Sequence, residues 1–195
     1  NQNHHAAKLI HQFVQNSWSP PPPLGDKGVV FFLAWTTTPW TLPSNLGLTV
    51  GPNIEYSLVK TFNPYTHLPI HVILAKALLH KYFKAEGENG DFEKYSPLSK
   101  GEGWSEAVPW KILQTFKGKD LEGIKYEQLF SYEANTIEKI QEQTPNAEPF
   151  KIILGDFVTT EDGTGIVHTA PAFGADDFKV GKKNNLGILV LVDKE

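Results

Sequence analysis

KGVVFFLAWTTT, residues 27–38, is a continuous run of β-branched and aromatic residues with the length of one strand. An apolar run without alternation is typical of a strand that is buried on both faces. We therefore expect a central strand here. Pro39 and Pro43 follow this run, and because proline has no backbone N–H to donate, regular strand pairing has to stop after Thr38.

Beyond this strand, the sequence predicts further strands and few long helices. The strand signals are LGLTVG (46–51), IEYSLVKTF (54–62), HVILAKALLHKYF (71–83), which passes into a helix, and parts of 108–130. KIILGDFVTTEDGTGIVHTA (151–170) carries an Asp-Gly pair between two strands and predicts a hairpin. We expect an exposed excursion at 85–103, a polar helix or loop at 135–149, and a helix from after Gly174 to near Gly187. The predicted fold is α+β, mainly β: a β-barrel or strongly bent sheet with peripheral helices.

The length and composition indicate one packed domain. The chain has 195 residues, of which 40% are hydrophobic, and we expect a single domain over residues 25–195. Residues 1–24 are interpreted as an arm or linker, because a loosely amphipathic stretch, a short helix or ordered arm, runs into WSPPPPL (18–24). The absence of cysteine excludes disulfides and cysteine chemistry. The absence of methionine and the start at Asn1 indicate a segment of a longer polypeptide.

The charge balance and hydropathy limit the expected partners. Eighteen Lys and Arg against 22 Asp and Glu give a net charge of -4, which argues against binding bulk nucleic acid through its phosphates. An RNA partner is expected to present only its end. No apolar run of about 18 residues and no leader-like segment occurs, so we expect a soluble, cytoplasmic protein without membrane contact. His4, His5 and His11 have no carboxylate among them, and we expect a solvated terminus rather than a metal site.

The segment WTTTPWTLPSN (35–45) places hydroxyl groups where an apolar strand ends. Three successive threonines occur there: Thr36, Thr37 and Thr38. Their hydroxyls can position a water or bind an ester carbonyl without being nucleophiles. Threonine is also simply a good strand residue, but Pro39 and Pro43 make a plain ladder impossible for all three. Asn45 is either an amide in the same pocket or a turn cap, and spacing alone favours the cap.

The segment GTGIVHTAPAFGADDF (163–178) joins a glycine turn, a strand histidine and two carboxylates. Gly163 and Gly165 permit a tight turn and a close backbone approach. A lone strand histidine such as His168 is more often a packed core group than a catalyst. Asp176 and Asp177 lie at the expected start of a helix, where a carboxylate is favoured as a cap, although one of the two could hold a cationic group.

Together, these two segments resemble the signature segments of the editing domain that is inserted into the isoleucyl-, valyl- and leucyl-tRNA synthetases of class I. GIVHTAP and AFGADDF are most similar to the isoleucine enzyme, and the resemblance runs from about Lys27 to the end of the chain. It implies a β-barrel that hydrolyses valine wrongly esterified to the isoleucine tRNA. Such a second sieve is needed because a hydrophobic pocket separates two substrates differing by one methylene only weakly.

The resemblance also implies roles for individual residues. Asp177 would bind the α-ammonium group of the misattached amino acid, and Asp176 would remain a cap. Thr36, Thr37 and Thr38 would contact the substrate carbonyl, the terminal adenosine or the attacking water, with Asn45 in the same pocket. His168 would set the size limit. Trp35 and Phe173 would form neighbouring walls.

The same resemblance limits the chemistry that we expect. The HIGH-like and KMSKS-like signatures of aminoacylation do not occur in the chain, so ATP is not expected to act here and editing would need no cofactor. The expected partners are the 3′ end of misacylated tRNA(Ile), valine and related small amino acids, and the rest of the parent synthetase. Two alternatives stay open: a valyl-tRNA synthetase editing domain that removes threonine from tRNA(Val), with His168 as a polar partner, and a non-catalytic module that binds aminoacyl-adenosine.

Overall fold

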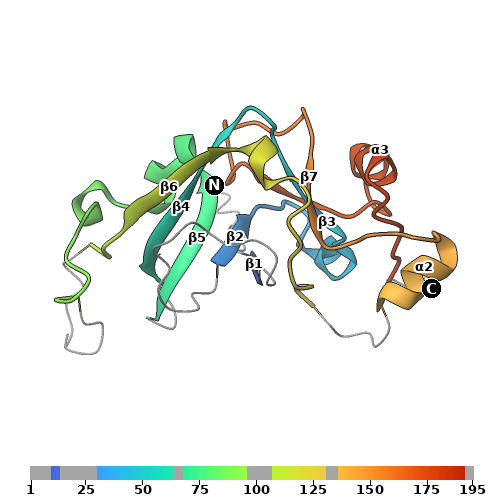
Figure 1. Cartoon of the computed structure of the whole chain (residues 1–195), viewed down its shortest axis with the longest axis horizontal. Coiled ribbons are helices and arrows are strands. Elements are labelled where there is room, and N and C mark those ends of the chain that lie inside the picture. Colours follow the sequence, from blue (N-terminus) through green and yellow to red (C-terminus); the bar gives the residue numbers. More distant parts are fainter. Residues whose placement is uncertain (1–9, 14–29, 64–67, 96–106, 131–135, 192–195) are drawn as a thin grey trace, which may run out of the picture.

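The structure is a computed structural model that describes residues 10–13, 30–63, 68–95, 107–130 and 136–191. Five strands form one sheet and three strands form a second (Figure 1). In the view of Figure 1 the larger sheet occupies the left half of the molecule, and the smaller sheet leads to helices α2 and α3 at the right. Mixed sheets with few helices agree with the predicted class, α+β and mainly β.

The apolar run at 27–38 forms the interior strand β2 (Val30–Ala34), as predicted. β2 is antiparallel to β1 (Ile10–Phe13) on one side and parallel to β5 (Pro69–Ala75) on the other. Phe32 belongs to the larger apolar core and Leu33 to a second cluster, so the strand is buried on both faces. β4 (Glu55–Phe62) and β6 (Lys111–Lys117) complete the sheet in the order β1-β2-β5-β4-β6.

The three-stranded sheet corrects the predicted hairpin at 151–170. β7 (Lys151–Leu154) and β8 (Ile166–Thr169) do not pair with each other, because β3 (Gly47–Val50) lies between them. β3 is parallel to β7 and antiparallel to β8. All four residues of β3 are buried, so the sheet gains a fully buried centre from a strand about 100 residues away. The Asp162-Gly163 pair predicts a turn from neighbouring residues alone, so it could not indicate that β3 lies between β7 and β8.

The predicted barrel is not confirmed: the described residues form two open sheets and no closed barrel. The sheets are joined where β2 ends. The Trp35 N–H donates to the Ile166 carbonyl at 2.9 Å, and the His168 N–H donates to the Trp35 carbonyl at 3.3 Å. On the opposite side, Tyr126 and Phe150 join the segment after β6 to the start of β7 by a hydrogen bond of 2.9 Å. Isolated bridges pair Trp35 with Val167 and Lys125 with Lys151 beside these hydrogen bonds.

Short helices connect the strands, and two longer ones lie beyond the small sheet. The 71–83 segment passes from β5 into helix, as predicted, and the polar 135–149 segment contains α2 (Thr136–Gln143). α3 (Ala175–Lys183) begins directly after Gly174, as predicted, but ends at Lys183, before Gly187. The remaining elements are η1 (Pro39–Ser44), η2 (Lys76–Leu78), α1 (Leu79–Tyr82), η3 (Ala85–Gly87) and η5 (Gly118–Leu121).

Two expectations fall partly outside the described residues. The 1–24 arm is described only at Ile10–Phe13, where a strand stands in place of the helix suggested by the spacing, since pairing with β2 supplies its backbone hydrogen bonds. The 85–103 excursion is described to Tyr95. Its first part is tied to the fold, because the Trp110 N–H donates to Gly87 at 2.9 Å and the Asn89 N–H donates to Trp110 at 2.8 Å.

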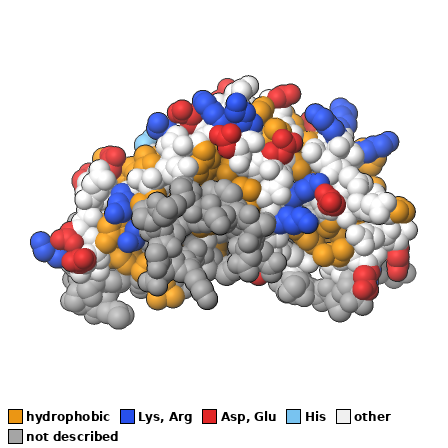
Figure 2. All heavy atoms as spheres, viewed as in Figure 1, with side chains coloured by type: hydrophobic (Ala, Val, Ile, Leu, Met, Phe, Trp, Pro, Cys, Tyr) orange, Lys and Arg blue, Asp and Glu red, His pale blue; other side chains and the backbone are white. Residues whose placement is uncertain are grey.

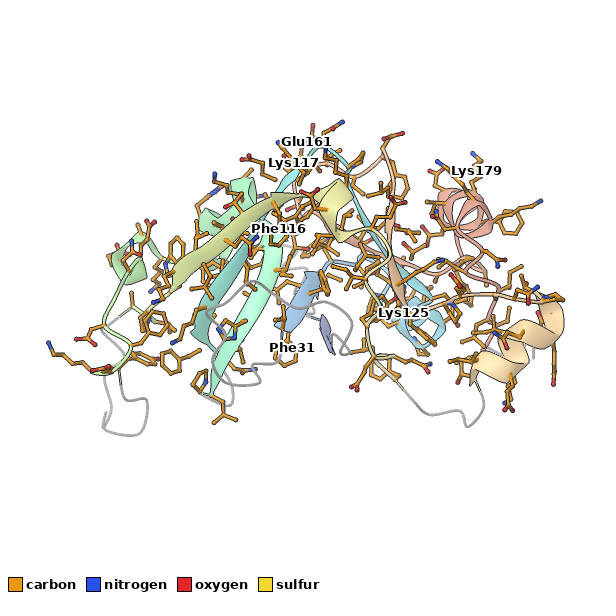
Figure 3. The ribbon with its side chains drawn as sticks, viewed as in Figure 1. Phe31, Phe116, Lys117, Lys125, Glu161 and Lys179 are labelled. Carbon is orange, nitrogen blue, oxygen red and sulfur yellow. The ribbon has the colours of Figure 1, made fainter. Side chains whose placement is uncertain are left out.

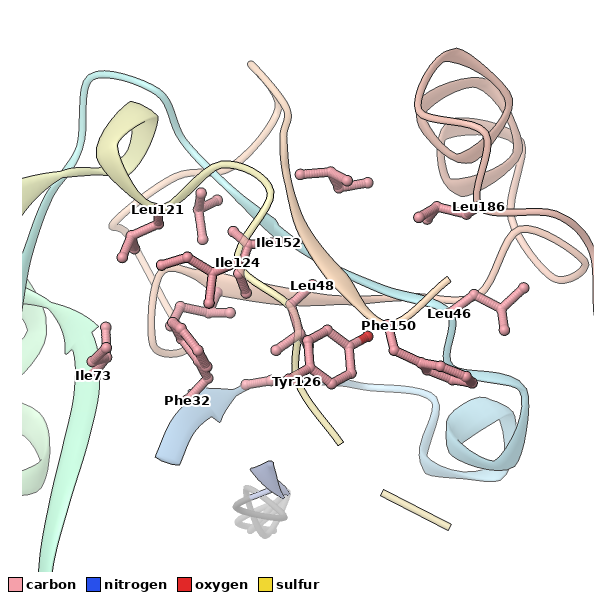
Figure 4. Packing of buried hydrophobic residues seen from close by; sticks show 14 of the residues in the cluster. Phe32, Leu46, Leu48, Ile73, Leu121, Ile124, Tyr126, Phe150, Ile152 and Leu186 are labelled. Atoms are coloured by element: carbon pink, nitrogen blue, oxygen red, sulfur yellow. The ribbon is translucent and has the colours of Figure 1, made fainter. Parts of the chain in front are cut away.

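The main core fills the space between the two sheets. Figure 4 shows Phe32, Ile73 and Leu48 converging on Leu121 and Ile152, so both sheets and the segment after β6 contribute side chains. Phe32, Ile73, Leu48 and Ile152 are completely buried. This packing fixes the end of β2 against β8, where the residues of both sequence motifs meet.

Gly165 lies at the junction of the two sheets and is held tightly. Its φ is +75°, and a Cβ built there would lie 2.4 Å from the Ala75 Cβ. We expect Gly165→Ala to lower the free energy of unfolding about 1–3 kcal/mol more than Gly123→Ala, because only Gly165 adds overpacking to the left-handed backbone. Gly123 has φ +80° with nothing within 4 Å of the built Cβ, and is the matched control. Urea unfolding of both variants measures the difference. Equal losses would mean that the contact with Ala75 contributes nothing.

Candidate functional site

The threonine row turns away from the sheet directly after β2. The Thr38 N–H donates to Thr36 Oγ1 at 3.0 Å, and the two hydroxyl oxygens lie 3.3 Å apart. Both side chains are half-buried, whereas Thr37 between them is exposed. The three threonines therefore do not form a plain ladder, as predicted from the prolines. Two hydroxyls face each other and the third points to solvent.

Thr41 extends the row into η1 and was not identified from the sequence. Its Oγ1 donates to the Thr38 carbonyl at 2.8 Å and lies 3.1 Å from Thr38 Oγ1. Pro39 begins η1, and residues three apart lie above each other in a 3₁₀ helix, so Thr41 returns to Thr38. The spacing Thr-x-x-Thr after a proline start would have been the signal for this residue.

His168 connects the second motif to this row. Its Nε2 lies 3.0 Å from Thr41 Oγ1, and its Nδ1 lies 2.8 Å from the Asn45 amide nitrogen. The side chain is only 5% exposed, and burial lowers the pKa of His168 to about 4. His168 is therefore neutral near pH 7. It is a buried histidine with both ring nitrogens bonded, one to Thr41 of the threonine row and the other to Asn45.

Asn45 caps the turn, as its spacing favoured, and its amide is buried. Its backbone N–H donates to the Leu42 carbonyl at 3.0 Å and closes η1. Its side chain is buried, donates to the Gly47 carbonyl at 2.8 Å and accepts from the Tyr126 hydroxyl at 2.7 Å. Tyr126 was not identified from the sequence, because it is one aromatic residue in a stretch without a motif.

Asp177 lies beside the end of β8. Its Oδ2 accepts the Ala170 N–H at 2.9 Å, two residues beyond His168. Burial, opposed by this hydrogen bond and reinforced by the charge of Asp176, raises the pKa of Asp177 above its ordinary value. Among the described residues no lysine or histidine forms an ion pair with it. A half-buried carboxylate that has no ion-pair partner in the described ranges can bind a cationic ligand through a charge-assisted hydrogen bond.

Asp176 is not the predicted cap. Gly174 holds the N-cap position of α3, and no side chain bonds there. Asp176 is exposed and pairs with Lys179 at 3.5 Å, one turn along the helix. Figure 3 shows Lys179 on the outer side of α3. Glycine occupies the N-cap position, and the two carboxylates have different surroundings. Asp176 is exposed to solvent, whereas Asp177 is bonded to the end of β8.

The predicted wall residues occupy different environments. Trp35 is half-buried and packs against Gly163, whose φ is +66° and whose built Cβ would lie 2.7 Å from the indole ring. The close backbone approach predicted for Gly163 and Gly165 is thus confirmed. Phe173 is 41% exposed in the turn before α3, where its N–H donates to Ala170 at 2.9 Å.

The structure thus brings most of the predicted residues to one end of β2 and β8. One hydrogen-bond network connects four of them. Thr41 links the pair Thr36 and Thr38 to His168, and His168 binds Asn45. Trp35 joins the network through its backbone carbonyl, which accepts the His168 N–H. Asp177 is bonded to the same β8 terminus, at Ala170. Thr37 forms no side-chain hydrogen bond in the described part of the chain, and the Phe173 ring is exposed. The roles of all these residues remain predictions.

Other surfaces offer less chemistry. Within the described ranges, no group of three His, Cys, Asp or Glu is arranged to hold a metal ion. Among the helices that the structure describes, none is both long and apolar enough to cross a membrane. A cavity of about 800 Å³ lies between α1 and Trp110, away from the predicted residues. On the face shown in Figure 2, positive and negative side chains are interspersed.

Sequence relatives are aminoacyl-tRNA ligases that are much longer than this chain. The chain is 55% identical over 163 residues to an isoleucine–tRNA ligase of Cytophaga hutchinsonii, covering 84% of the chain and 13% of the relative. It is 50% identical over 177 residues to that of Porphyromonas gingivalis, covering 90% of the chain and 14% of the relative. The chain therefore spans about one seventh of these relatives. No family model matches it.

Solved structures share the fold at low sequence identity. GlLeuRS-CP1 matches with a TM-score of 0.54 at 17% identity, over 90% of this chain and 59% of that one. The editing domain of the Plasmodium falciparum (P.falciparum) cytosolic leucyl-tRNA synthetase matches with a TM-score of 0.50 at 19% identity, over 83% and 49%. At these identities the likeness concerns the fold alone.

Proposed function

The chain belongs to the isoleucine–tRNA ligase family and has the fold of leucyl-tRNA synthetase editing domains, and on this premise we propose that it hydrolyses the ester of a wrong amino acid on tRNA. The observation that carries the proposal is the meeting of two motifs. A hydroxyl row leaves β2 near the β8 terminus, which is bonded to Asp177, a carboxylate without an ion-pair partner among the described residues. An aminoacyl ester presents a cation close to the carbon that water attacks. This arrangement offers a carboxylate for the cation and hydroxyl oxygens that can hold the water.

In the proposed reaction, Asp177 binds the α-ammonium group of the substrate. Oδ2 is fixed by the Ala170 N–H, which leaves Oδ1 to accept from the ligand. The threonine row orients the water whose oxygen attacks the ester carbon. A bond forms between them, the bond from that carbon to the ribose oxygen breaks, and a proton from water passes to the ribose oxygen. Positioning and electrostatic stabilisation carry this step, because His168, the histidine in the network, has both nitrogens engaged.

We further propose that the substrate is valine esterified to tRNA(Ile), with isoleucine excluded by size. His168, Trp35 and Phe173 form the walls of the pocket in this proposal. The alternative substrate, threonine on tRNA(Val), needs a polar partner for the threonine hydroxyl. His168 is a poor candidate for that partner, since Thr41 and Asn45 already occupy its two nitrogens. Valine is therefore the better match.

The partners in this proposal follow from the same chemistry. The 3′ end of the tRNA enters the site, while the rest of a parent synthetase holds the body of the tRNA. The mixed surface charge in Figure 2 agrees with contact to a tRNA end rather than to a long stretch of phosphates. The reaction needs no cofactor and belongs to the cytoplasm, where tRNA is charged for translation.

Deacylation of valine-charged and isoleucine-charged tRNA(Ile) by this chain, at high protein concentration, tests the proposed function. We expect the valine ester to be lost at least about tenfold faster, because the extra methylene of isoleucine exceeds the proposed size limit. Equal rates for the two esters would contradict the size limit. Binding of a valyl-adenosine analogue without hydrolysis of either ester would favour the non-catalytic module instead.

A further inference from the structure

A chain of hydrogen bonds leads from Tyr126 through Asn45 and His168 to Thr41, and the donor of each bond can be assigned. Asn45 receives the Tyr126 hydroxyl at its Oδ1 (2.7 Å) and donates from its Nδ2 to the Gly47 carbonyl (2.8 Å). A carbonyl can only accept, so the group facing Gly47 has to be the amide nitrogen. The orientation of the Asn45 amide is therefore fixed by its surroundings.

This orientation determines which nitrogen of His168 carries the proton. The second N–H of Asn45 Nδ2 points at His168 Nδ1, 2.8 Å away, so Nδ1 has to accept and cannot be protonated. The proton of the neutral ring then resides on Nε2, which donates to Thr41 Oγ1 at 3.0 Å. The opposite tautomer would set two donors against each other inside the core.

The donors among the threonines follow from this tautomer, and two lines of hydrogen bonds converge on Thr41 Oγ1. Thr41 accepts from His168 and passes its own hydroxyl proton to the Thr38 carbonyl at 2.8 Å. Thr41 Oγ1 can then only accept from Thr38 Oγ1 (3.1 Å), which in turn accepts from Thr36 Oγ1 (3.3 Å). The hydroxyl protons of Thr36, Thr38 and Thr41 all point inward, so these three residues present oxygen lone pairs to an approaching ligand. Its natural partner is a hydrogen-bond donor, such as the attacking water or a ribose hydroxyl.

We propose that Asn45 is a positioning residue, anchored by Tyr126, which fixes His168 as the Nε2–H tautomer and so makes the threonine row an acceptor of hydrogen bonds. This inference rests on the proposed function and revises the predicted role of Asn45, which acts through His168 rather than on the substrate. The row receives an O–H of the water, and the water's lone pair is left facing the ester carbon.

The burial of Tyr126 supports this assignment. Figure 4 shows its ring within the apolar core, beside Leu48 and Phe150, with the hydroxyl at the edge of the cluster. The residue is 4% exposed, and the Phe150 ring meets it edge-on at 6.2 Å. A buried hydroxyl is costly unless it is bonded, and here the bond goes to Asn45 Oδ1. Burial also raises the pKa of Tyr126 well above its ordinary value, so this group stays a donor.

The test is the isosteric replacement Asn45→Asp in the 195-residue chain, read by ¹⁵N NMR of the His168 ring. In the unsubstituted chain we expect the proton on Nε2. In Asn45→Asp the group facing Nδ1 becomes an acceptor, so the proton moves to Nδ1, and kcat for deacylation of the valine ester falls about tenfold with KM unchanged. Asn184→Asp is the matched control, since Asn184 donates to the Val180 carbonyl at 2.8 Å outside the network.

The outcomes separate the inference from the proposed function. A proton on Nδ1 in the unsubstituted chain overturns the assignment, and that spectrum alone decides if Asn45→Asp does not fold. An unchanged tautomer in Asn45→Asp, or a changed tautomer with unchanged kcat, overturns the positioning role. If the Nε2–H form is found but the unsubstituted chain hydrolyses neither ester, the proposed function fails and the tautomer assignment stands.

Discussion

Asp177→Asn is expected to lower kcat/KM for deacylation of the valine ester by roughly 10–100-fold. The α-ammonium group of the substrate loses a charged partner, and a charge-assisted hydrogen bond of this kind is worth about 1.5–3 kcal/mol. Asparagine keeps an oxygen that can accept the Ala170 N–H, so the geometry of the β8 terminus is retained. Deacylation kinetics of valine-charged tRNA(Ile) measure the change.

The same substitution should not destabilise the fold at pH 7. Burial is the largest cause that raises the pKa of Asp177, so the folded chain holds this proton more tightly than the unfolded chain. The pKa of Asp177 is higher in the folded chain than in the unfolded chain, so ionisation of Asp177 lowers the free energy of unfolding. This loss develops as the pH rises from the unfolded pKa through the folded pKa, and it is complete above the folded pKa. Asparagine removes this loss. Loss of activity without loss of stability is the signature of a ligand site rather than of a structural cap.

Asp176→Asn is the matched control for this prediction. Asp176 neighbours Asp177 in the first turn of α3, but it is exposed and pairs only with Lys179 among the described residues. Its replacement changes the net charge by the same amount. We expect less than a twofold change in deacylation, because screened surface pairs contribute little. Similar losses in the two variants would contradict a specific role for Asp177 and indicate a general charge effect.

The sequence predicted the elements that depend on local pattern. The apolar run before Thr38 became the interior strand β2, and Gly174 preceded a helix, since both signals reside in neighbouring residues. The predicted β7–β8 hairpin was wrong because the buried strand β3 lies between the two strands and pairs with both. No local signal indicates a pairing partner about 100 residues away. The barrel is not confirmed for a related reason: its closure depends on long-range pairing between sheet edges, and the described residues form two open sheets.

The site could be predicted only in part for the same physical reason. Thr36, Asn45 and His168 lie in two motifs, and the spacing of each motif placed them at strand ends. Their connection runs through Thr41 and Tyr126, which contribute single hydroxyls. A hydroxyl has no periodicity, and its partner is chosen by packing. Tyr126 reaches Asn45 only because the segment after β6 runs along β7.

The buried histidine gives the second large effect, on stability at low pH. Burial lowers the pKa of His168 to about 4, from an ordinary value of 6.5. The unfolded chain binds this proton more readily, so the stabilisation from neutral His168 is fully present above pH 6.5 and is lost as the pH falls towards 4. The difference corresponds to about 3 kcal/mol. We expect the unsubstituted chain to lose this amount over that range in excess of His168→Gln, which has no titrating group at this position.

Urea unfolding at several pH values measures this effect as a difference between two chains. The carboxylates titrate in both the unsubstituted chain and His168→Gln. Subtracting one curve of unfolding free energy against pH from the other therefore leaves the contribution of His168. Between pH 7 and 8 the two curves should run parallel, which is the internal control. Parallel curves down to pH 4 would instead mean that the ring ionises within the fold, with Asn45 turning its amide oxygen towards Nδ1. Such a result would also remove the fixed direction of donation, so one titration decides whether the network is rigid enough to orient a water.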